Sequence, residues 1–336
     1  MRKDLRLRRH CLTASLPHFT GIALLLLTAA MPVSAQPYPA RPIRLIVPFP
    51  PGTTLDVVGR LVALRAGDRL GQQVVVDNRS GASGTIGVET AARAAPDGYT
   101  WGLGTTTTHA LAHILNPKLG YDPVRDFAPV ALLGETPYFL TTNPAFPASN
   151  VREFVAYARA NPGKVSYASV GNFSMGHLAG ELLKKAGGFE MVHVPYKGSN
   201  LALIDLLAGR IQLNVSTIPA SLPHVRAGKL RALAVASPQR VATLRDTPTV
   251  AESGFPGYEA VLWVGAFVPA RTPDAVLARI RRETDAVLHS AEMRDALAEQ
   301  AFEPGKLEPA AFAARMREDT ARWQKVITES GLKPDQ

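Results

Sequence analysis

From residue 40 onward, short apolar runs alternate with segments whose apolar residues recur at helical spacing. The segment 55–70 shows the helical pattern clearly, because Val58, Leu61 and Val62 fall on one side and Gly71 follows the last turn. Strands are predicted at residues 42–47, 73–77, 99–104, 165–169, 191–195, 211–215 and 230–236. Helices are predicted at residues 55–70, 85–95, 150–161, 176–186, 200–208 and 220–227, and along the whole tail from Pro273, with Thr272 as its N-cap.

This alternation of strands and helices predicts an α/β fold, in which mostly parallel sheets are flanked by helices. Two longer apolar runs, residues 130–142 and 261–269, lie at the junctions between blocks of the pattern. We interpret these runs as the segments that cross between two lobes. The first lobe then comprises residues 36–136 and 262–336, and the second comprises residues 137–261.

The first 35 residues have the layout of a secretory signal peptide. Five basic residues lie among the first nine, an apolar run covers residues 21–30, and Val33-Ser34-Ala35 supplies small residues for cleavage. The run is short of the roughly 20 residues that a membrane-spanning helix needs, which disfavours an uncleaved anchor. We therefore expect residues 1–35 to be removed and the protein to work outside the cytoplasm.

Charge and cysteine content narrow the function further. The chain has 37 basic and 28 acidic residues, but five of the basic and one of the acidic residues lie in the first 35, so the remainder carries a net charge of +5. This charge is spread without long basic runs, so it gives no reason to expect nucleic acid and mildly favours a small anionic ligand. Cys11 is the one cysteine, so the chain after the signal peptide can form no disulfide, zinc–thiolate site or cysteine nucleophile.

Ligands of open α/β sheets bind beyond the carboxyl ends of the strands. The turns at those ends are residues 48–56, 104–109, 169–174, 195–199 and 215–219. They are rich in Gly, Ser, Thr and Asn and nearly free of charge, so backbone N–H groups, hydroxyls and helix N-termini would hold a carboxylate with neutral dipoles. The candidate ligand-binding residues are Phe49, Pro50, Gly52, Thr53, Thr54, Asp56, Thr105, Thr106, Thr107, Ser169, Gly171, Asn172, Ser174, Tyr196, Lys197 and Ser216.

Several of these candidates also have a simpler explanation. Thr53, Thr54 and Ser174 are residue types that commonly cap helix N-termini. Asp56 either binds water or a ligand amine, or sits at a helix N-terminus, where acidic residues are favoured. Lys197 either pairs with a ligand carboxylate or is a solvated turn residue. The binding interpretation therefore depends on five such turns meeting at one sheet edge.

The sequence gives weak support to catalysis. Ser174 lacks the Gly-x-Ser-x-Gly spacing of a nucleophile elbow. His109 and His113 have the spacing of a metal pair on a helix but lack the glutamate of His-Glu-x-x-His. We therefore expect no catalytic residue, no metal and no cofactor, and an exported enzyme acting on a small acid is the less favoured alternative.

Nine collinear segments of the chain carry a family resemblance. They are residues 38–52, 71–79, 95–99, 121–130, 177–182, 192–198, 222–224, 228–234 and 248–252, and a characteristic one is Val192-His-Val-Pro-Tyr-Lys-Gly198. Together they span essentially the whole chain after the predicted signal peptide. In these segments the chain resembles the periplasmic solute-binding receptors of tripartite tricarboxylate transporters, the Bug family.

The resemblance implies a two-lobed, type II-like periplasmic-binding-protein fold that closes on a small carboxylate between its lobes. It implies ligand contacts from residues 49–56, 105–107 and 169–174, delivery to a large and a small membrane subunit, and a periplasmic location. We expect the receptor to be a monomer. A sensing module that signals to a membrane receptor is the alternative role. Two positions depart from the family pattern: Thr53 replaces a second glycine, and Ser216-Thr217 replaces Asp-Asn, which changes the donors and the charge of the pocket.

Overall fold

A computed structural model describes residues 38–330 of the chain. The predicted signal peptide, residues 1–35, lies outside the described residues. Among the helices of residues 38–330, none combines the length and the apolar character needed to cross a membrane.

The chain first builds three parallel strands with their connecting helices. These elements are β1 (Ile43–Val47), α1 (Thr54–Leu70), β2 (Val74–Asn78), η1 (Ala82–Gly84), α2 (Thr85–Ala92), β3 (Thr100–Thr105), η2 (Thr106–Leu111) and α3 (Ala112–Leu115). Helix α1 begins where the Thr53 hydroxyl accepts the Asp56 N–H, and it ends at Gly71, whose φ of 70° is open to glycine without steric cost. The prediction for residues 55–70 is therefore confirmed at both ends.

The middle of the chain repeats this arrangement. Its elements are β4 (Phe127–Thr142), α4 (Val151–Ala160), β5 (Ser166–Ser169), α5 (Met175–Gly187), β6 (Val192–Pro195), α6 (Ser199–Leu207), β7 (Leu213–Thr217), α7 (Ile218–Arg226), β8 (Arg231–Val235) and η3 (Ala242–Leu244). Asn150 caps α4 by accepting the N–H of Glu153 at 3.0 Å, as its sequence predicts. The helix then buries Val151, Phe154 and Ala158 on one face.

The C-terminal part differs from the continuous helix that the sequence predicts. Its elements are β9 (Val261–Pro269), α8 (Asp274–Leu288), α9 (Ala291–Glu299), β10 (Glu303–Pro304) and α10 (Pro309–Ser330). The short strand β10 pairs with β4 between the second and third helices, so the prediction of a wholly helical tail is wrong. Pro304 and Gly305 lie at this break, and both residue types interrupt helices.

The N-cap of α8 is also displaced by one residue from the prediction. The Leu277 N–H donates to the Pro273 carbonyl at 2.9 Å, which makes Pro273 the cap. The Thr272 hydroxyl instead donates to the Pro269 carbonyl at 2.7 Å and closes the turn before the helix.

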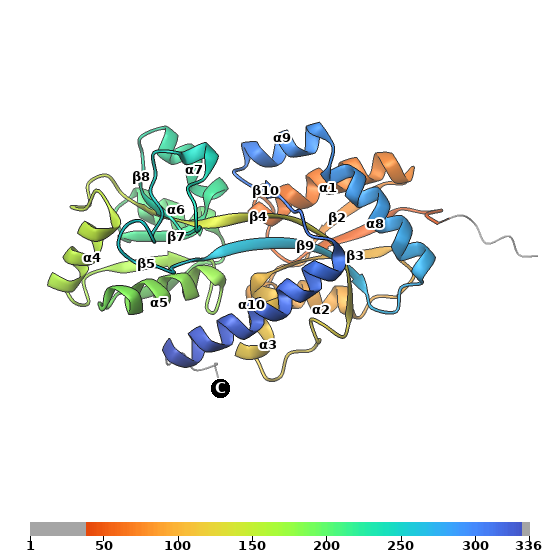
Figure 1. Cartoon of the computed structure of the whole chain (residues 1–336), viewed down its shortest axis with the longest axis horizontal. Coiled ribbons are helices and arrows are strands. Elements are labelled where there is room, and N and C mark those ends of the chain that lie inside the picture. The colour runs from red at the N-terminus through yellow and green to blue at the C-terminus, as the bar shows by residue number, and fades with distance from the viewer. Residues whose placement is uncertain (1–37, 331–336) are drawn as a thin grey trace, which may run out of the picture. The chain divides into compact units, whose positions relative to one another are not determined.

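The two long strands β4 and β9 join two sets of parallel strands. Within residues 38–330 the order is β2-β1-β3-β9-β4-β7-β5-β6, with β8 and β10 also paired to β4. β4 pairs with β9 as far as Pro137, and from Tyr138 onward it pairs with β7 and β8. Both strands run antiparallel to their neighbours, whereas β1–β3 and β5–β7 are parallel. The two apolar runs of the sequence are thus these connecting strands (Figure 1).

Helices cover both faces of each strand set. Figure 1 shows α1, α8 and α9 on one side of β1–β3 and α2, α3 and α10 on the other. The sheet side chains beneath them pack into several apolar clusters. Trp101 and Tyr167 are almost fully buried in the largest cluster, and Trp263 is almost fully buried in a second one. The strand-to-helix turns follow the carboxyl ends of the parallel strands, at the edge of the sheets.

Candidate functional site

Five strand-to-helix turns meet at one pocket. They follow β1, β3, β5, β6 and β7 and lead into α1, η2, α5, α6 and α7. The pocket has a cavity volume of about 60 Å³. Its lining residues are Phe49, Pro50, Thr53, Thr54, Leu55, Thr105, Thr107, Tyr138, Val170, Ser174, Lys197, Gly198, Ser199, Val215, Ser216, Thr217 and Leu262. Since five helices begin here, their N-terminal N–H groups give the pocket a partial positive charge.

We call residues 49–56 and 105–107 the first wall, and residues 169–174, 197–199 and 215–217 the second wall. Nine predicted residues line the pocket: Phe49, Pro50, Thr53, Thr54, Thr105, Thr107, Ser174, Lys197 and Ser216. The residues that sequence reasoning did not select are Leu55, Tyr138, Val170, Gly198, Ser199, Val215, Thr217 and Leu262. Six of these eight lie in the predicted turns, whereas Tyr138 and Leu262 belong to β4 and β9.

Seven predicted residues lie outside the lining: Gly52, Asp56, Thr106, Ser169, Gly171, Asn172 and Tyr196. Tyr196 turns away from the pocket, and its hydroxyl donates to the Asp205 carboxylate at 2.6 Å. Burial and this bond raise the pKa of Tyr196 to about 12. Asn172 lines an adjacent groove of about 340 Å³. The other five residues belong to the two walls but do not line the pocket: Gly52, Asp56, Thr106, Ser169 and Gly171.

Asp56 fixes the shape of the first wall. Asp56 is 3% exposed, and its carboxylate accepts hydrogen bonds from the Gly52 N–H, Arg60 and Asn78, each at 2.9 Å. Asn78 also donates to the Phe49 carbonyl at 3.0 Å, so the loop is held at both ends. Burial acts to raise the pKa of Asp56, but the hydrogen bonds from Arg60, Gly52 and Asn78 outweigh it and hold that pKa below its usual range. Both carboxylate oxygens are thus engaged within the wall.

The threonine run completes the first wall. The Thr105 hydroxyl accepts the Thr108 N–H at 3.4 Å, and the Thr108 hydroxyl accepts the Thr105 N–H at 2.9 Å, a reciprocal capping box. Behind it, the Thr106 hydroxyl donates to the Val261 carbonyl at 3.4 Å. Thr107 is left facing the pocket, where its hydroxyl accepts the Met175 N–H of α5 at 3.2 Å.

The second wall leaves more of its polar groups available. Neither α6 nor α7 has a side-chain hydrogen bond at its N-cap, because Gly198 has no side chain and the Thr217 hydroxyl lies 2.9 Å from the Thr54 hydroxyl instead. Lys197 is exposed and makes no hydrogen bond or ion pair with the rest of residues 38–330. Among the lining residues, all drawn from that range, Lys197 is the one charged residue. The pocket therefore offers positive potential and no carboxylate.

Ser216 and Thr217 form an uncharged part of the second wall. The Ser216 hydroxyl accepts a hydrogen bond from Asn214 at 2.9 Å and lies 3.1 Å from the Ser221 hydroxyl. The base of the second wall is therefore neutral.

The strand sets that carry the two walls are in direct contact. The Thr54–Thr217 bond joins the walls themselves, the Thr107 hydroxyl of the first wall accepts the Met175 N–H, and the Ser83 hydroxyl donates to the Asn172 carbonyl of the second wall at 2.9 Å. Each of these bonds joins the strand set of β1–β3 to that of β5–β7. Moving the two strand sets apart would break all three.

The chain is similar to known proteins along most of its length. A model of the tripartite tricarboxylate transporter family receptor matches residues 58–332. The chain belongs to this receptor family. Protein BugT of Bordetella pertussis is 37% identical over 314 residues, which cover 93% of this chain and 96% of that protein.

Solved structures agree with the family assignment. An R. palustris protein solved with adipate is 38% identical, with a TM-score of 0.85 over 89% of this chain and 100% of that chain. The periplasmic binding protein BugD is 32% identical, with a TM-score of 0.82 over 88% of this chain and 99% of that chain. The predicted periplasmic-binding-protein fold is therefore confirmed, and the tripartite tricarboxylate receptors to which the chain belongs bind solutes and are not enzymes.

His109, one of the two histidines with the spacing of a metal pair, packs against an aromatic side chain. The His109 ring stacks on Phe267 with centroids 4.1 Å apart, and its Nδ1 lies 2.9 Å from the Thr108 hydroxyl. Residues 38–330 contain no group of three or more His, Cys, Asp or Glu side chains that could hold a metal ion.

Proposed function

We propose that this protein is a periplasmic receptor that binds a small carboxylate in the pocket between the two walls. The observation that carries the proposal is the lining itself: five helix N-termini, several hydroxyls and one lysine without an ion pair in the described chain surround the space, and no acidic residue does. Anions are stabilised at helix N-termini, and a lysine adds a charge-assisted hydrogen bond. The adipate bound to the R. palustris relative is consistent with a ligand of this class.

Ligand entry then depends on two lobes, residues 36–136 with 262–336 and residues 137–261. The change of partners along β4 at Pro137 and Tyr138, together with the Tyr138 N–H donating to the Ala260 carbonyl, supports a hinge at these crossings. Hinge motion about two connecting strands would separate the walls, admit the ligand and close on it. The candidate residues named from the sequence would contact the ligand or hold the walls in place.

The receptor's place in the cell follows from the same proposal. Its signal peptide, residues 1–35, would direct it to the periplasm, where it acts as a monomer. A large and a small membrane subunit of a tripartite tricarboxylate transporter would receive the loaded form. The family description supports this partnership.

Thermal unfolding of the purified protein with a panel of acids tests the proposal. The panel contains adipate, malate, citrate, glutamate and benzoate, each beside its neutral amide. A ligand at 100 times its dissociation constant adds about 2.7 kcal/mol, which raises the melting temperature by several degrees. We expect a shift with one class of carboxylate and none with the matching amide. Equal shifts with acid and amide, or none with any acid, would contradict carboxylate binding.

A further inference from the structure

The 169–174 loop of the second wall has an unusual backbone. It connects β5 to α5 and contributes Val170 and Ser174 to the pocket lining. Phe173 has a φ of 57°, in the left-handed region that a bulky side chain rarely adopts. Such a conformation persists only where surrounding contacts hold it.

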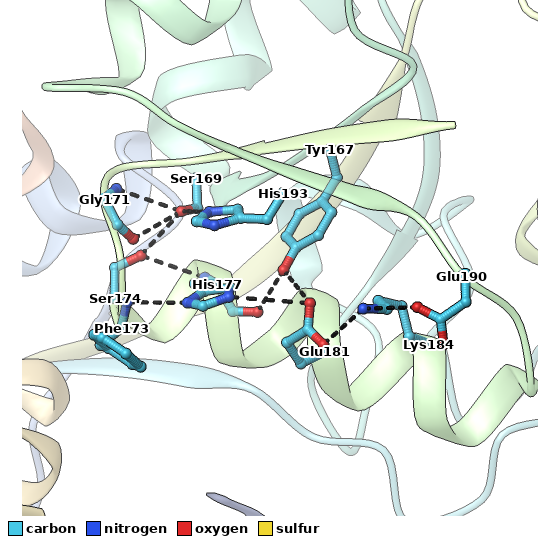
Figure 2. A network of polar contacts seen from close by, with 10 residues as sticks. All are labelled: Tyr167, Ser169, Gly171, Phe173, Ser174, His177, Glu181, Lys184, Glu190 and His193. Atoms are coloured by element: carbon cyan, nitrogen blue, oxygen red, sulfur yellow. Dashed lines mark hydrogen bonds and ion pairs between the residues drawn. The ribbon is translucent and has the colours of Figure 1, made fainter. Parts of the chain in front are cut away.

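Two histidines hold this loop from behind. The Phe173 N–H donates to His177 Nδ1 at 3.0 Å, and the Ser169 hydroxyl lies 2.7 Å from His193 Nε2. The Ser174 hydroxyl donates in turn to the Ser169 hydroxyl at 3.2 Å. The two imidazole rings lie face to face (Figure 2). Their centroids are 3.9 Å apart and their planes are 7° from parallel. The stack thus touches the loop at both of its ends.

The surroundings of the stack favour uncharged rings. His177 is 7% exposed, and the nearest carboxylate, Glu181, lies 4.0 Å from its Nε2. That carboxylate is already paired with Lys184 at 2.9 Å, which also pairs with Glu190 at 3.1 Å. The ionisable groups around the stack are Tyr167 on β5, Glu181 and Lys184 on α5, Glu190 after α5 and Tyr258 before β9, while Glu329 of α10 pairs with Lys185 on the exposed side of α5.

Protonation would disrupt this arrangement for two reasons. His177 Nδ1 must be free of a proton to accept the Phe173 N–H, and a protonated ring would set two donors against each other. Two charged rings 3.9 Å apart would also repel each other. Burial lowers the pKa of His177 to about 4, with a further contribution from Lys184. Burial and the neighbouring His177 likewise lower the pKa of His193 to about 4.

We infer that the stacked pair of His177 and His193 positions the ligand loop while both rings are neutral, and that acid releases the loop and the ligand with it. The part of this inference that concerns the ligand rests on the proposed function. Because both pKa values are depressed in the folded state, the stabilisation is complete above the ordinary histidine pKa of 6.5 and is lost as the pH falls from 6.5 towards 4. His177 and His193 are therefore positioning residues of the site.

Hydrogen exchange read by mass spectrometry tests the positioning step without any ligand. After correction for the intrinsic pH dependence, we expect peptides covering residues 170–175 to exchange at least tenfold faster at pH 4.5 than at pH 7. In His177→Gln, whose amide oxygen accepts the Phe173 N–H but does not titrate, the change should be less than threefold. The α4 peptide 151–160 serves as the internal reference for global folding.

A matched variant separates this response from general effects of histidine replacement. His289 is 67% exposed and pairs with Asp285 outside the second wall, so His289→Gln should retain the full acid response of the wild type. If the α4 reference peptide of His177→Gln exchanges without protection, that variant is not folded, and His193→Gln then provides the second test. An acid response that is absent from the wild type, or identical in the wild type and both site variants, would overturn the positioning role.

Calorimetry with adipate tests the release step. Adipate loses its own charge equally for every variant, so the comparison is the ratio of affinities at pH 7 and pH 4.5. We expect this ratio to be at least tenfold larger for the wild type than for the His177→Gln/His193→Gln double variant. Equal ratios would overturn acid release. Absence of adipate binding at either pH would count against the proposed function for this ligand, while the exchange measurement still decides whether the stack positions the loop.

Discussion

The first wall satisfies its own polar groups, whereas the second wall keeps several of them open to the pocket. In the first wall, Asp56 is hydrogen-bonded by three partners and the helices after Thr53 and Thr105 are capped by those side chains. In the second wall, α6 and α7 have no side-chain cap, and Lys197 has no partner within residues 38–330. The two sides of one pocket thus use the same residue types for different purposes.

This difference separates the side chains that stabilise the fold from those that are open to a ligand. Polar groups that are already paired in the protein define a shape, and removing one leaves its partner buried and unsatisfied. Polar groups that are open to the pocket gain their partner only from a ligand, so removing one costs affinity and little stability. Substitutions in the first wall should therefore act mainly on folding, and substitutions in the second mainly on binding.

The largest expected effect is on folding, from Asp56→Ala. This change removes the acceptor for Gly52, Arg60 and Asn78 at once, and we expect the free energy of unfolding to fall by about 3 kcal/mol. Urea denaturation at pH 7 measures it. Since the pKa of Asp56 is lowered in the fold, its contribution is complete above the ordinary aspartate value of 3.8 and is lost below it. The difference between variant and wild type should therefore shrink in acid.

Asp77→Ala is the matched control. Asp77 forms ion pairs with two arginines, Arg44 and Arg79, but its side chain is 27% exposed and lies outside the pocket. Ion pairs in contact with solvent contribute less than about 1 kcal/mol. A loss from Asp56→Ala no greater than from Asp77→Ala would show that the first wall is not held by its buried carboxylate.

Lys197→Met should produce the largest change in binding. A hydrogen bond to a charged group contributes about 2 kcal/mol, so we expect the affinity for adipate, or for the acid that binds best, to fall about 30-fold. The free energy of unfolding should change by less than about 0.5 kcal/mol, because the side chain is exposed. Calorimetry and urea denaturation on the same variant measure both quantities.

Lys164→Met removes an exposed lysine from the turn after α4, outside the pocket lining. It lowers the net charge by the same amount, so it reports the general electrostatic contribution. If the two lysine variants bind equally well, the second wall does not supply the charge that the ligand meets.

Sequence reasoning found the turns of the site better than the individual contacts. The change from strand pattern to helix pattern identifies carboxyl ends of strands, so all five turns at the pocket could be predicted. Tyr138 and Leu262 could not, because a strand residue faces the pocket or the core according to the register of β4 and β9. Tyr196 lies in a predicted turn, yet its hydroxyl donates to Asp205 on α6 and not to the pocket.

Contacts between segments that are distant in the sequence could not be predicted either. His177 and His193 are separated by a helix end and a loop, and only the packing of α5 on β6 brings their rings together. Of the three partners of Asp56, Asn78 is the most distant in the sequence and lies at the end of the next strand along the chain. The tail shows a similar limit, since β10 forms because β4 offers it an edge, which no local pattern records.

The smallest effect compares two glycines with the same backbone strain. Gly52 and Gly71 have φ values of 78° and 70°, and at both positions an added Cβ would meet no atom within 4 Å. Alanine is strained equally in this region, so Gly52→Ala and Gly71→Ala should each lower the free energy of unfolding by about 1 kcal/mol. Urea denaturation measures this common cost.

Their effects on binding should differ, because only Gly52 lies in the first wall. The strain at Gly52 can relax by moving the loop that carries Phe49 and Thr53 into the pocket, and we expect adipate affinity to fall roughly threefold to tenfold, equivalent to about 1 kcal/mol. Gly71 ends α1 at its other terminus, 17 helical residues away, so its variant should bind as the wild type does. Equal affinities for the two variants would mean that the first wall tolerates displacement, and that the second wall alone determines how tightly the ligand is held.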